Sequence, residues 1–121
     1  MRVQVYWNLH KKQWSVVALE GERKGRVISH AAGAIFLEDV KFAVQPAGRD
    51  RVRREGRKNV HAFVRGEWVS NMAHVRTFRR WAPVVYDPYK FDTFVFVDNQ
   101  EPVFSAKSVA LLGPRDVVAE V

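Results

Sequence analysis

The N-terminal residues alternate between apolar and polar side chains with a period of two. Within residues 2–9, one face carries Val3, Val5, Trp7 and Leu9, and the other face carries mainly polar side chains. Because successive side chains of a β-strand point to opposite faces of its sheet, this pattern predicts a strand with one buried face.

Two further strands are expected after short polar turns. A turn at residues 11–13 leads into residues 14–19, which are rich in valine and tryptophan and fit the partner strand of a hairpin. Residues 21–25 begin and end with glycine, which frees the backbone for a second turn, and residues 26–30 then form a third strand. The N-terminal region is therefore predicted to be an antiparallel meander.

Residues 35–44 predict a fourth strand with an irregular pattern. Most of its apolar side chains lie on the same face of the strand as Glu38, but Ile35 and Leu37 lie on the other face. This mixture indicates either a strand covered on both faces near its start or a β-bulge near residues 38–39 that exchanges the faces. Both alternatives suit a central position in the sheet.

A short surface helix is expected next. Residues 49–55 fit about two helical turns, with Gly56 as the left-handed residue that ends the helix. Val52 is the only apolar side chain in this stretch, so a helix here must lie on the surface, and a basic loop is the alternative. Oppositely charged residues at helical spacing would form ion pairs, Asp50 with Arg54 and Arg51 with Glu55.

The rest of the chain predicts mainly strands. Residues 59–68 fit a hairpin whose turn is Gly66-Glu67. Residues 70–82 fit a helix that ends before Pro83, and an irregular strand is the alternative. Further strands are expected at 84–86, 93–97 and 103–112, with turns at 87–90 and 98–102 and with the tail 115–121 as an edge strand.

These elements predict an α+β fold that is predominantly antiparallel β, built of a meander and hairpins with one or two short helices. The length of 121 residues and the hydrophobic content of 47% fit a single domain spanning residues 1–121. The chain has no cysteine, which excludes disulfides and thiolate chemistry. The longest apolar run, residues 31–37, is far shorter than the roughly 20 residues of a membrane span. With no signal-peptide pattern at the N-terminus, we expect a cytoplasmic protein without a membrane partner.

Positive charge is concentrated in residues 46–66, the basic segment. Seven cationic and two anionic side chains give this segment +5 of the formal net charge of +7. Arginine presents a planar set of donors that matches phosphate oxygens, so the segment predicts a phosphate-bearing ligand, and a solvated charged face is the alternative. The expected ligand contacts are Arg49, Arg53, Arg54, Arg57, Lys58, Asn59, His61, Arg65, Tyr86, Tyr89 and Lys90.

Each group has an expected role in this site. Phosphate would be neutralised by Arg49, Arg53, Arg54, Arg57 and Lys58, and Asn59 and His61 would add directional hydrogen bonds. Tyr86, Tyr89 and Lys90 would close the site if their turn folds over the ligand. Nearby aromatic side chains would stack on bases, at about 1–3 kcal/mol per base. The segment lacks the spacing of a P-loop and any recognisable RNA-binding signature or recognition helix, which argues against an NTPase and against base reading in a groove.

Acid–base catalysis is an alternative from another class. His61 lies beside cations in the sequence, and with His10 nearby it would suit a small metal-independent ribonuclease in which His61 is the acid or base. A histidine on a strand is more often a packing or surface residue, so we expect a binding protein rather than an enzyme. The histidines lack paired ligand spacing and the aspartates lie in separate turns, so neither a metal nor a cofactor is expected.

Three segments resemble small uncharacterised proteins of tailed phages and prophages. They are Tyr6–Lys12, Gly56–Gly66 and Tyr86–Lys90. In such proteins an asparagine often stands at the position of Asp87 and a cysteine at that of Gln13, so no thiol role carries over to this chain. The resemblance implies a phage accessory protein in the cytoplasm of a bacterial host, and it brings no established activity with it.

The resemblance also suggests a biological setting for the basic segment. Phage proteins of this size often act against host defence, and some sequester signalling nucleotides, so by analogy the ligand is a signalling nucleotide or a nucleic acid. The rival hypothesis is a protein–protein inhibitor that docks the basic segment on an acidic host protein. Aromatic side chains such as Trp68 and Trp81 also suit a subunit interface, so a homo-oligomer stays open.

Overall fold

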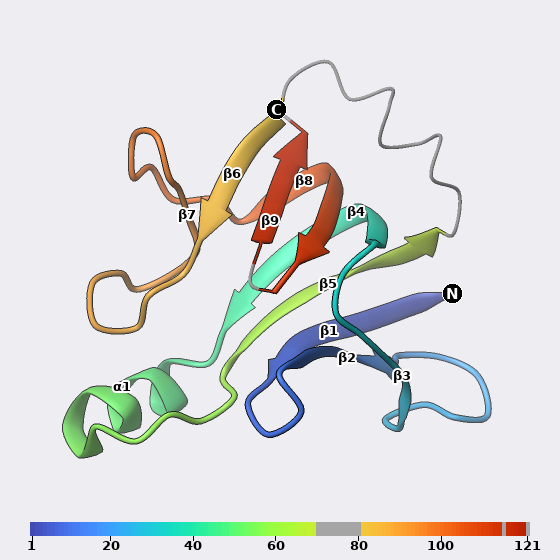
Figure 1. Cartoon of the computed structure of the whole chain (residues 1–121), viewed down its shortest axis with the longest axis horizontal. Helices are drawn as coiled ribbons and strands as arrows, with labels where there is room; N and C mark the ends of the chain where they lie inside the picture. Colours follow the sequence, from blue (N-terminus) through green and yellow to red (C-terminus); the bar gives the residue numbers. More distant parts are fainter. Residues whose placement is uncertain (70–80, 115, 121) are drawn as a thin grey trace.

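The structure, a computed structural model, describes residues 1–69, 81–114 and 116–120. All nine strands in these ranges belong to one antiparallel sheet, in the order β3-β2-β1-β5-β4-β8-β9-β6-β7 (Figure 1). The elements are β1 (Arg2–Asn8), β2 (Gln13–Ala18), β3 (Val27–Ala31), β4 (Ile35–Val44), α1 (Pro46–Glu55), β5 (Ala62–Val69), β6 (Trp81–Val85), β7 (Val95–Phe96), β8 (Ser105–Gly113) and β9 (Asp116–Glu120). The predicted predominance of antiparallel β-structure with a short helix is confirmed.

The predicted N-terminal meander is present. β1 pairs with β2, and β2 pairs with β3, both antiparallel. Val3, Val5 and Val16 are completely buried, as the period-two pattern requires. Trp7 and Trp14 face each other across β1 and β2, and their rings pack edge to face with centroids 5.2 Å apart.

β4 lies in the centre of the sheet, between β5 and β8, and it contains the predicted bulge. Its register against β5 shifts at Asp39, which has a φ of 49°. Both explanations of its irregular pattern hold, because Ile35 and Leu37 enter the main core while Phe36 packs in a smaller cluster with residues of β8 and β9.

The hairpin predicted for residues 59–68 is wrong. β5 is one continuous strand, and Gly66 lies inside it, paired with Val3 of β1. A Cβ atom at Gly66 would lie 2.9 Å from the carbonyl oxygen of Glu38. The glycine is therefore required by the close approach of the β4 bulge and not by a turn.

The C-terminal strands correct two further expectations. Residues 70–80, most of the ambiguous segment, lie outside the described residues, but residues 81 and 82 begin β6 and are not helical. Pro83 lies within that strand rather than after a helix. The tail does form a strand, β9, yet it lies between β8 and β6 and not at an edge of the sheet.

The sheet coils so that strands far apart in its order share one core. Side chains of β1 and β2, such as Val5 and Trp14, belong to the same buried cluster as Val84 of β6 and Val117 of β9. The indole N–H of Trp14 donates to the carbonyl oxygen of Gly113 at 3.0 Å, which ties β2 to the end of β8. The concave face of a strongly twisted sheet thus encloses the core.

α1 begins three residues earlier than predicted, because Pro46 has the backbone geometry of a first helical residue. Gly56 ends the helix with a φ of 69°, as predicted, and Val52 is its buried anchor. The expected ion pairs between residues four apart are wrong, since the pairs of this helix within the described ranges run from Arg49 and Arg53 to Asp50 and Asp92. No helix of the described residues has the length and apolarity needed to cross a membrane.

Candidate functional site

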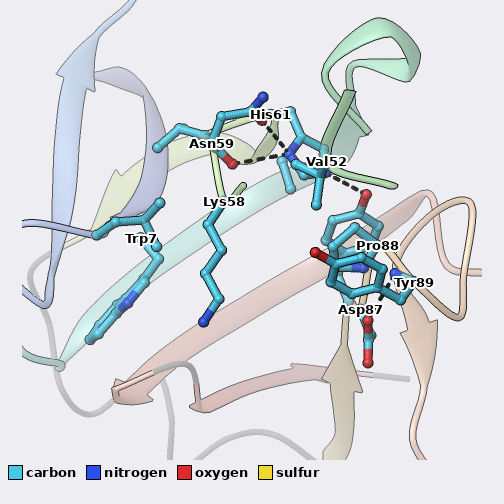
Figure 2. A pocket seen from close by; sticks show the side chains of 12 residues that line it. Trp7, Val52, Lys58, Asn59, His61, Asp87, Pro88 and Tyr89 are labelled. Carbon is cyan, nitrogen blue, oxygen red and sulfur yellow. Dashed lines mark hydrogen bonds between the residues drawn. The ribbon is translucent and has the colours of Figure 1, made fainter. Parts of the chain in front are cut away.

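A pocket of about 340 Å³ opens at the end of the sheet where β1 ends and β5 begins. The turn that follows β6 forms its opposite wall, and Figure 2 shows the side chain of Lys58 extending between Trp7 and this turn. The lining residues are Trp7, Leu9, Val52, Lys58, Asn59, Val60, His61, Ala62, Tyr86, Asp87, Pro88 and Tyr89.

The three segments that resemble phage proteins meet at this pocket. Residues 6–12 supply the first wall, residues 56–66 the floor and one side, and residues 86–90 the opposite wall. Val52 of α1 is the one lining residue from elsewhere in the chain. The fold therefore converts three separate sequence features into one site.

A hydrogen-bonded chain fixes one side of the pocket. The Nδ1 atom of the buried His61 lies 3.0 Å from Oδ1 of Asn59 and 3.1 Å from its backbone oxygen, and both oxygens are acceptors. Nδ1 therefore carries the proton, which leaves Nε2 to accept from the hydroxyl of Tyr86 at 2.6 Å (Figure 2). Both ring nitrogens of His61 are thus engaged by hydrogen bonds.

Tyr86 is held as a hydrogen-bond donor. Burial raises the pKa of Tyr86 to about 12, because the charged phenolate would lose its hydration, although the nearby guanidinium groups of Arg49 and Arg53 oppose this effect. Its ring packs against Phe94, with centroids 5.3 Å apart, and against the imidazole of His61. At neutral pH the phenol therefore keeps its proton, and its hydroxyl donates a hydrogen bond to His61.

Gly48 allows α1 to pack directly against His61. A Cβ atom at this position would lie 2.5 Å from Cβ of His61 and 3.3 Å from its Cγ. Any side chain here would therefore push the imidazole away from its partners. The glycine therefore serves a close approach inside the helix.

Two arginines attach the turn after β6 to the helix. Arg53 donates through Nε to the carbonyl oxygen of Pro88 at 2.5 Å, and through Nη2 to that of Phe91 at 3.0 Å and to Oδ1 of Asp92 at 2.9 Å. Arg49 donates to the carbonyl oxygen of Asp92 at 3.1 Å. Both arginines were expected to neutralise phosphate, and the structure instead engages them in positioning the pocket wall.

Lys58 brings a positive charge into the pocket. Its side chain is exposed and forms no ion pair with any residue that the structure describes. Asp87 lines the opposite wall, but its Oδ1 accepts the backbone N–H of Tyr89 at 2.9 Å, which is local turn chemistry. The ammonium group of Lys58 is therefore available to an anionic ligand.

The other residues expected to contact the ligand fall into two groups, those that line the pocket and those that lie outside it. Those in the pocket lining are Lys58, Asn59, His61, Tyr86 and Tyr89. Arg54, Arg57 and Lys90 are exposed outside the lining, and Arg65 of β5 donates to Oε1 of Gln4 at 2.6 Å. His10 lies in the exposed turn after β1, so the partner of His61 is Tyr86 and not a second histidine.

The apolar side of the pocket, formed by Trp7, Leu9 and Val60, was not predicted from the sequence. Trp7 is the last apolar side chain of β1, and Leu9 follows directly after the strand. β1 continues here beyond Val5, the last of its residues that pairs with β5. The sequence did carry a signal for this wall, because the apolar positions Trp7 and Leu9 continue the period-two pattern of β1 beyond the residues that pair with β5. Val60 was likewise assigned to a hairpin face rather than to the rim of a pocket.

Six of the twelve lining side chains are apolar, and the others supply one ammonium group, one amide, one imidazole, one carboxylate and two phenols. Such a concave, largely apolar surface with few polar groups suits a small molecule that carries an anionic group. Because both nitrogens of His61 are engaged, the imidazole offers no free base to the pocket. In the described ranges no three histidine, aspartate or glutamate side chains are grouped as a metal site.

Comparison with known proteins gives one family. The sequence model described as Mycobacterium phage L5 gene 82 protein matches residues 1–119. The Gene 82 protein of Mycobacterium phage L5 is 46% identical over 117 residues, which cover 92% of this chain and 90% of that protein. No solved structure matches the chain. The expected resemblance to phage proteins is confirmed.

Proposed function

We propose that this chain, which belongs to the Mycobacterium phage L5 gene 82 protein family, binds one small organic phosphate in the pocket around Lys58. The observation that carries the proposal is the ammonium group of Lys58, which enters a largely apolar pocket and has no ion-pair partner among the described residues. A phosphate there would gain a close positive charge in a partly desolvated site.

Pocket size favours a small molecule over a polynucleotide. A volume of about 340 Å³ lies near the lower end of the range of roughly 300–1,000 Å³ for small-molecule sites. Binding of single-stranded nucleic acid usually uses a longer basic groove with several stacking platforms. The first test therefore compares small phosphates, nucleoside monophosphates among them, with a polynucleotide, and capture of a small host phosphate would fit a role against host defence.

The cationic side chains outside the pocket lining would attract an anionic ligand without contacting it in the bound state. Arg54, Arg57 and Lys90 are exposed near the ends of the segments that form the pocket. Such a local excess of positive charge attracts anions and raises their rate of association, and salt weakens this attraction. Arg49 and Arg53 contribute differently, because they keep the wall that carries Tyr86 and Tyr89 in place.

The experiment is a binding screen with matched lysine variants. The wild type, Lys58→Ala and Lys24→Ala are titrated by calorimetry with inorganic phosphate, adenosine monophosphate, guanosine monophosphate and a twenty-nucleotide single-stranded DNA. Lys24 is exposed in the turn between β2 and β3, so its loss removes the same charge away from the pocket. We expect saturable binding of a small phosphate that Lys58→Ala weakens at least tenfold and Lys24→Ala leaves within twofold.

Two results would contradict the proposal. Equal weakening by both lysine variants would mean that net charge, and not the pocket, attracts the ligand. Tighter binding of the DNA, with a steep loss of affinity between 50 and 200 mM salt (about 2.5 orders of magnitude for six phosphate contacts on a single strand), would indicate a polyanion surface instead.

The rival hypotheses have their own signatures in the same samples. An inhibitor of a host protein would bind none of these compounds and would form a stoichiometric complex with an acidic protein. A ribonuclease that uses His61 would shorten RNA, and His61→Gln would abolish that activity.

A further inference from the structure

A second cavity, called the inner cavity, adjoins the pocket on the side where residues of β1, β2, β5, β6 and β9 face one another. Its volume is about 130 Å³. Trp7, Ala62 and Tyr86 line both cavities, so these side chains form the partition between them. The other residues around the inner cavity are Val5, Trp14, Val64, Val84, Val85, Phe94 and Val117.

The inner cavity offers little for a polar group to bind. Its lining consists of aliphatic and aromatic side chains, and the polar atoms of two of the aromatics are already engaged. The indole N–H of Trp14 donates to the carbonyl oxygen of Gly113 at 3.0 Å, and the hydroxyl of Tyr86 donates to His61 at 2.6 Å. Apolar cavities of this kind exclude water and accept hydrocarbon or aryl groups.

The geometry points to a ligand whose phosphate lies at Lys58 and whose organic part is a short hydrocarbon that passes between Trp7 and Tyr86 into the inner cavity. This inference rests on the proposed binding of an organic phosphate and names the chemical class of that ligand. Ala62 has the smallest side chain of the partition, so a larger side chain there should narrow the way between the two cavities.

A nucleobase fits this cavity poorly. Its ring edge carries several hydrogen-bond donors and acceptors, and burial without partners is unfavourable for each of them. A methylene or methyl group has no such requirement and gains from leaving water. The outer rim is also apolar, since Leu9, Val60 and Tyr89 are all more than a third exposed there.

The volume of the inner cavity limits the length of the hydrocarbon. A methylene group occupies roughly the volume of a water molecule, about 30 Å³, so the cavity holds about four carbons. Each buried methylene should tighten binding about fourfold. Affinity should therefore rise along a series of alkyl phosphates and then level off.

The test is a calorimetric titration of the intact protein with inorganic, methyl, ethyl, butyl and hexyl phosphate at constant ionic strength. We expect about fourfold tighter binding per added carbon up to butyl phosphate and little further gain with hexyl phosphate. Ala62→Leu should flatten this dependence, whereas Ala32→Leu, in the exposed loop after β3, should keep it. The wild-type series tests the inference even if a variant fails to fold. Quenching or a shift of tryptophan fluorescence by hexyl phosphate provides a second readout, because Trp7 and Trp14 line the cavity.

The outcomes separate the two proposals. Equal affinity for methyl and hexyl phosphate, with weaker binding in Lys58→Ala, would overturn the inference about the hydrocarbon and leave the phosphate site standing. Equal affinity for hexanol and hexyl phosphate, unaffected by Lys58→Ala, would overturn the phosphate site on which the inference rests. A dependence on chain length that Ala62→Leu leaves unchanged would place the hydrocarbon elsewhere and would also overturn the inference.

Discussion

The hydrogen bond between Tyr86 and His61 gives the most specific prediction about the structure of the site. Tyr86→Phe removes the hydroxyl that lies 2.6 Å from Nε2 of His61. The imidazole is only 4% exposed, and no other described residue contacts this nitrogen by a hydrogen bond, so the variant leaves a buried acceptor without a partner. Such a loss costs about 1–3 kcal/mol of unfolding free energy.

The coupling between the two residues isolates this bond from other effects. His61→Leu removes the acceptor, so adding Tyr86→Phe to it should cost less than Tyr86→Phe costs alone. We expect a coupling energy of about 1–2 kcal/mol, within the usual range for residues in direct contact. Urea denaturation of the wild type, both single variants and the double variant measures this quantity at neutral pH.

Tyr6→Phe is the matched control for the loss of a phenolic hydroxyl. The ring of Tyr6 packs against Phe63, and no hydrogen bond of its hydroxyl occurs among the described residues, so its loss should change stability by less than about 0.5 kcal/mol. If Tyr86→Phe is equally mild, or if the two changes at the site are additive, then the hydrogen-bonded chain does not hold the pocket as we describe.

Three further predictions concern the same region. Burial raises the pKa of Tyr86 to about 12, so above pH 10 the unfolded chain loses the phenolic proton before the folded chain does. The unfolding free energy should therefore fall between about pH 10 and 12, and more steeply in the wild type than in Tyr86→Phe when measured by urea denaturation across this range. Gly48→Ala should destabilise the protein by about 1–3 kcal/mol in thermal or urea unfolding, because the new Cβ atom would clash with His61. Alanine normally favours a helix over glycine, so a stabilised variant would refute this contact. Arg53→Gln should cost about 1 kcal/mol and speed amide exchange in residues 87–92. Arg51→Gln should do neither, because Arg51 lies on the same helix but forms no hydrogen bond or ion pair with the described residues. Equal exchange in both variants would show that Arg53 does not hold the turn.

Local patterns determined most of what could be predicted from the sequence. The alternation at Val3 and Val5 and the cap at Gly56 depend on the chain within a few residues, and the structure has both. Gly66 was misassigned because its reason is a contact with Glu38, far away in the sequence, and a single sequence does not distinguish a turn glycine from a close-approach glycine.

The same limit applies to the candidate site. Charge identified the basic segment, but it did not distinguish arginines that bond to the protein from a lysine that faces a pocket. Arg53 finds its acceptors in a turn more than thirty residues away, and that pairing depends on the path of β6 through the sheet. Trp7 became part of the pocket for the same reason, because the coil of the sheet brings the end of β1 opposite Tyr86.

The most direct test of the phosphate site is a chemical-shift map of the ¹⁵N-labelled protein titrated with butyl phosphate. The account predicts saturable shifts centred on the backbone amides of residues 7–9, 58–62 and 86–89, which form the pocket, and their loss in Lys58→Ala. Residues 51 and 54, on the exposed side of α1, should shift little. Shifts confined to that side of the helix, or shifts that persist in Lys58→Ala, would contradict a pocket that binds phosphate through Lys58.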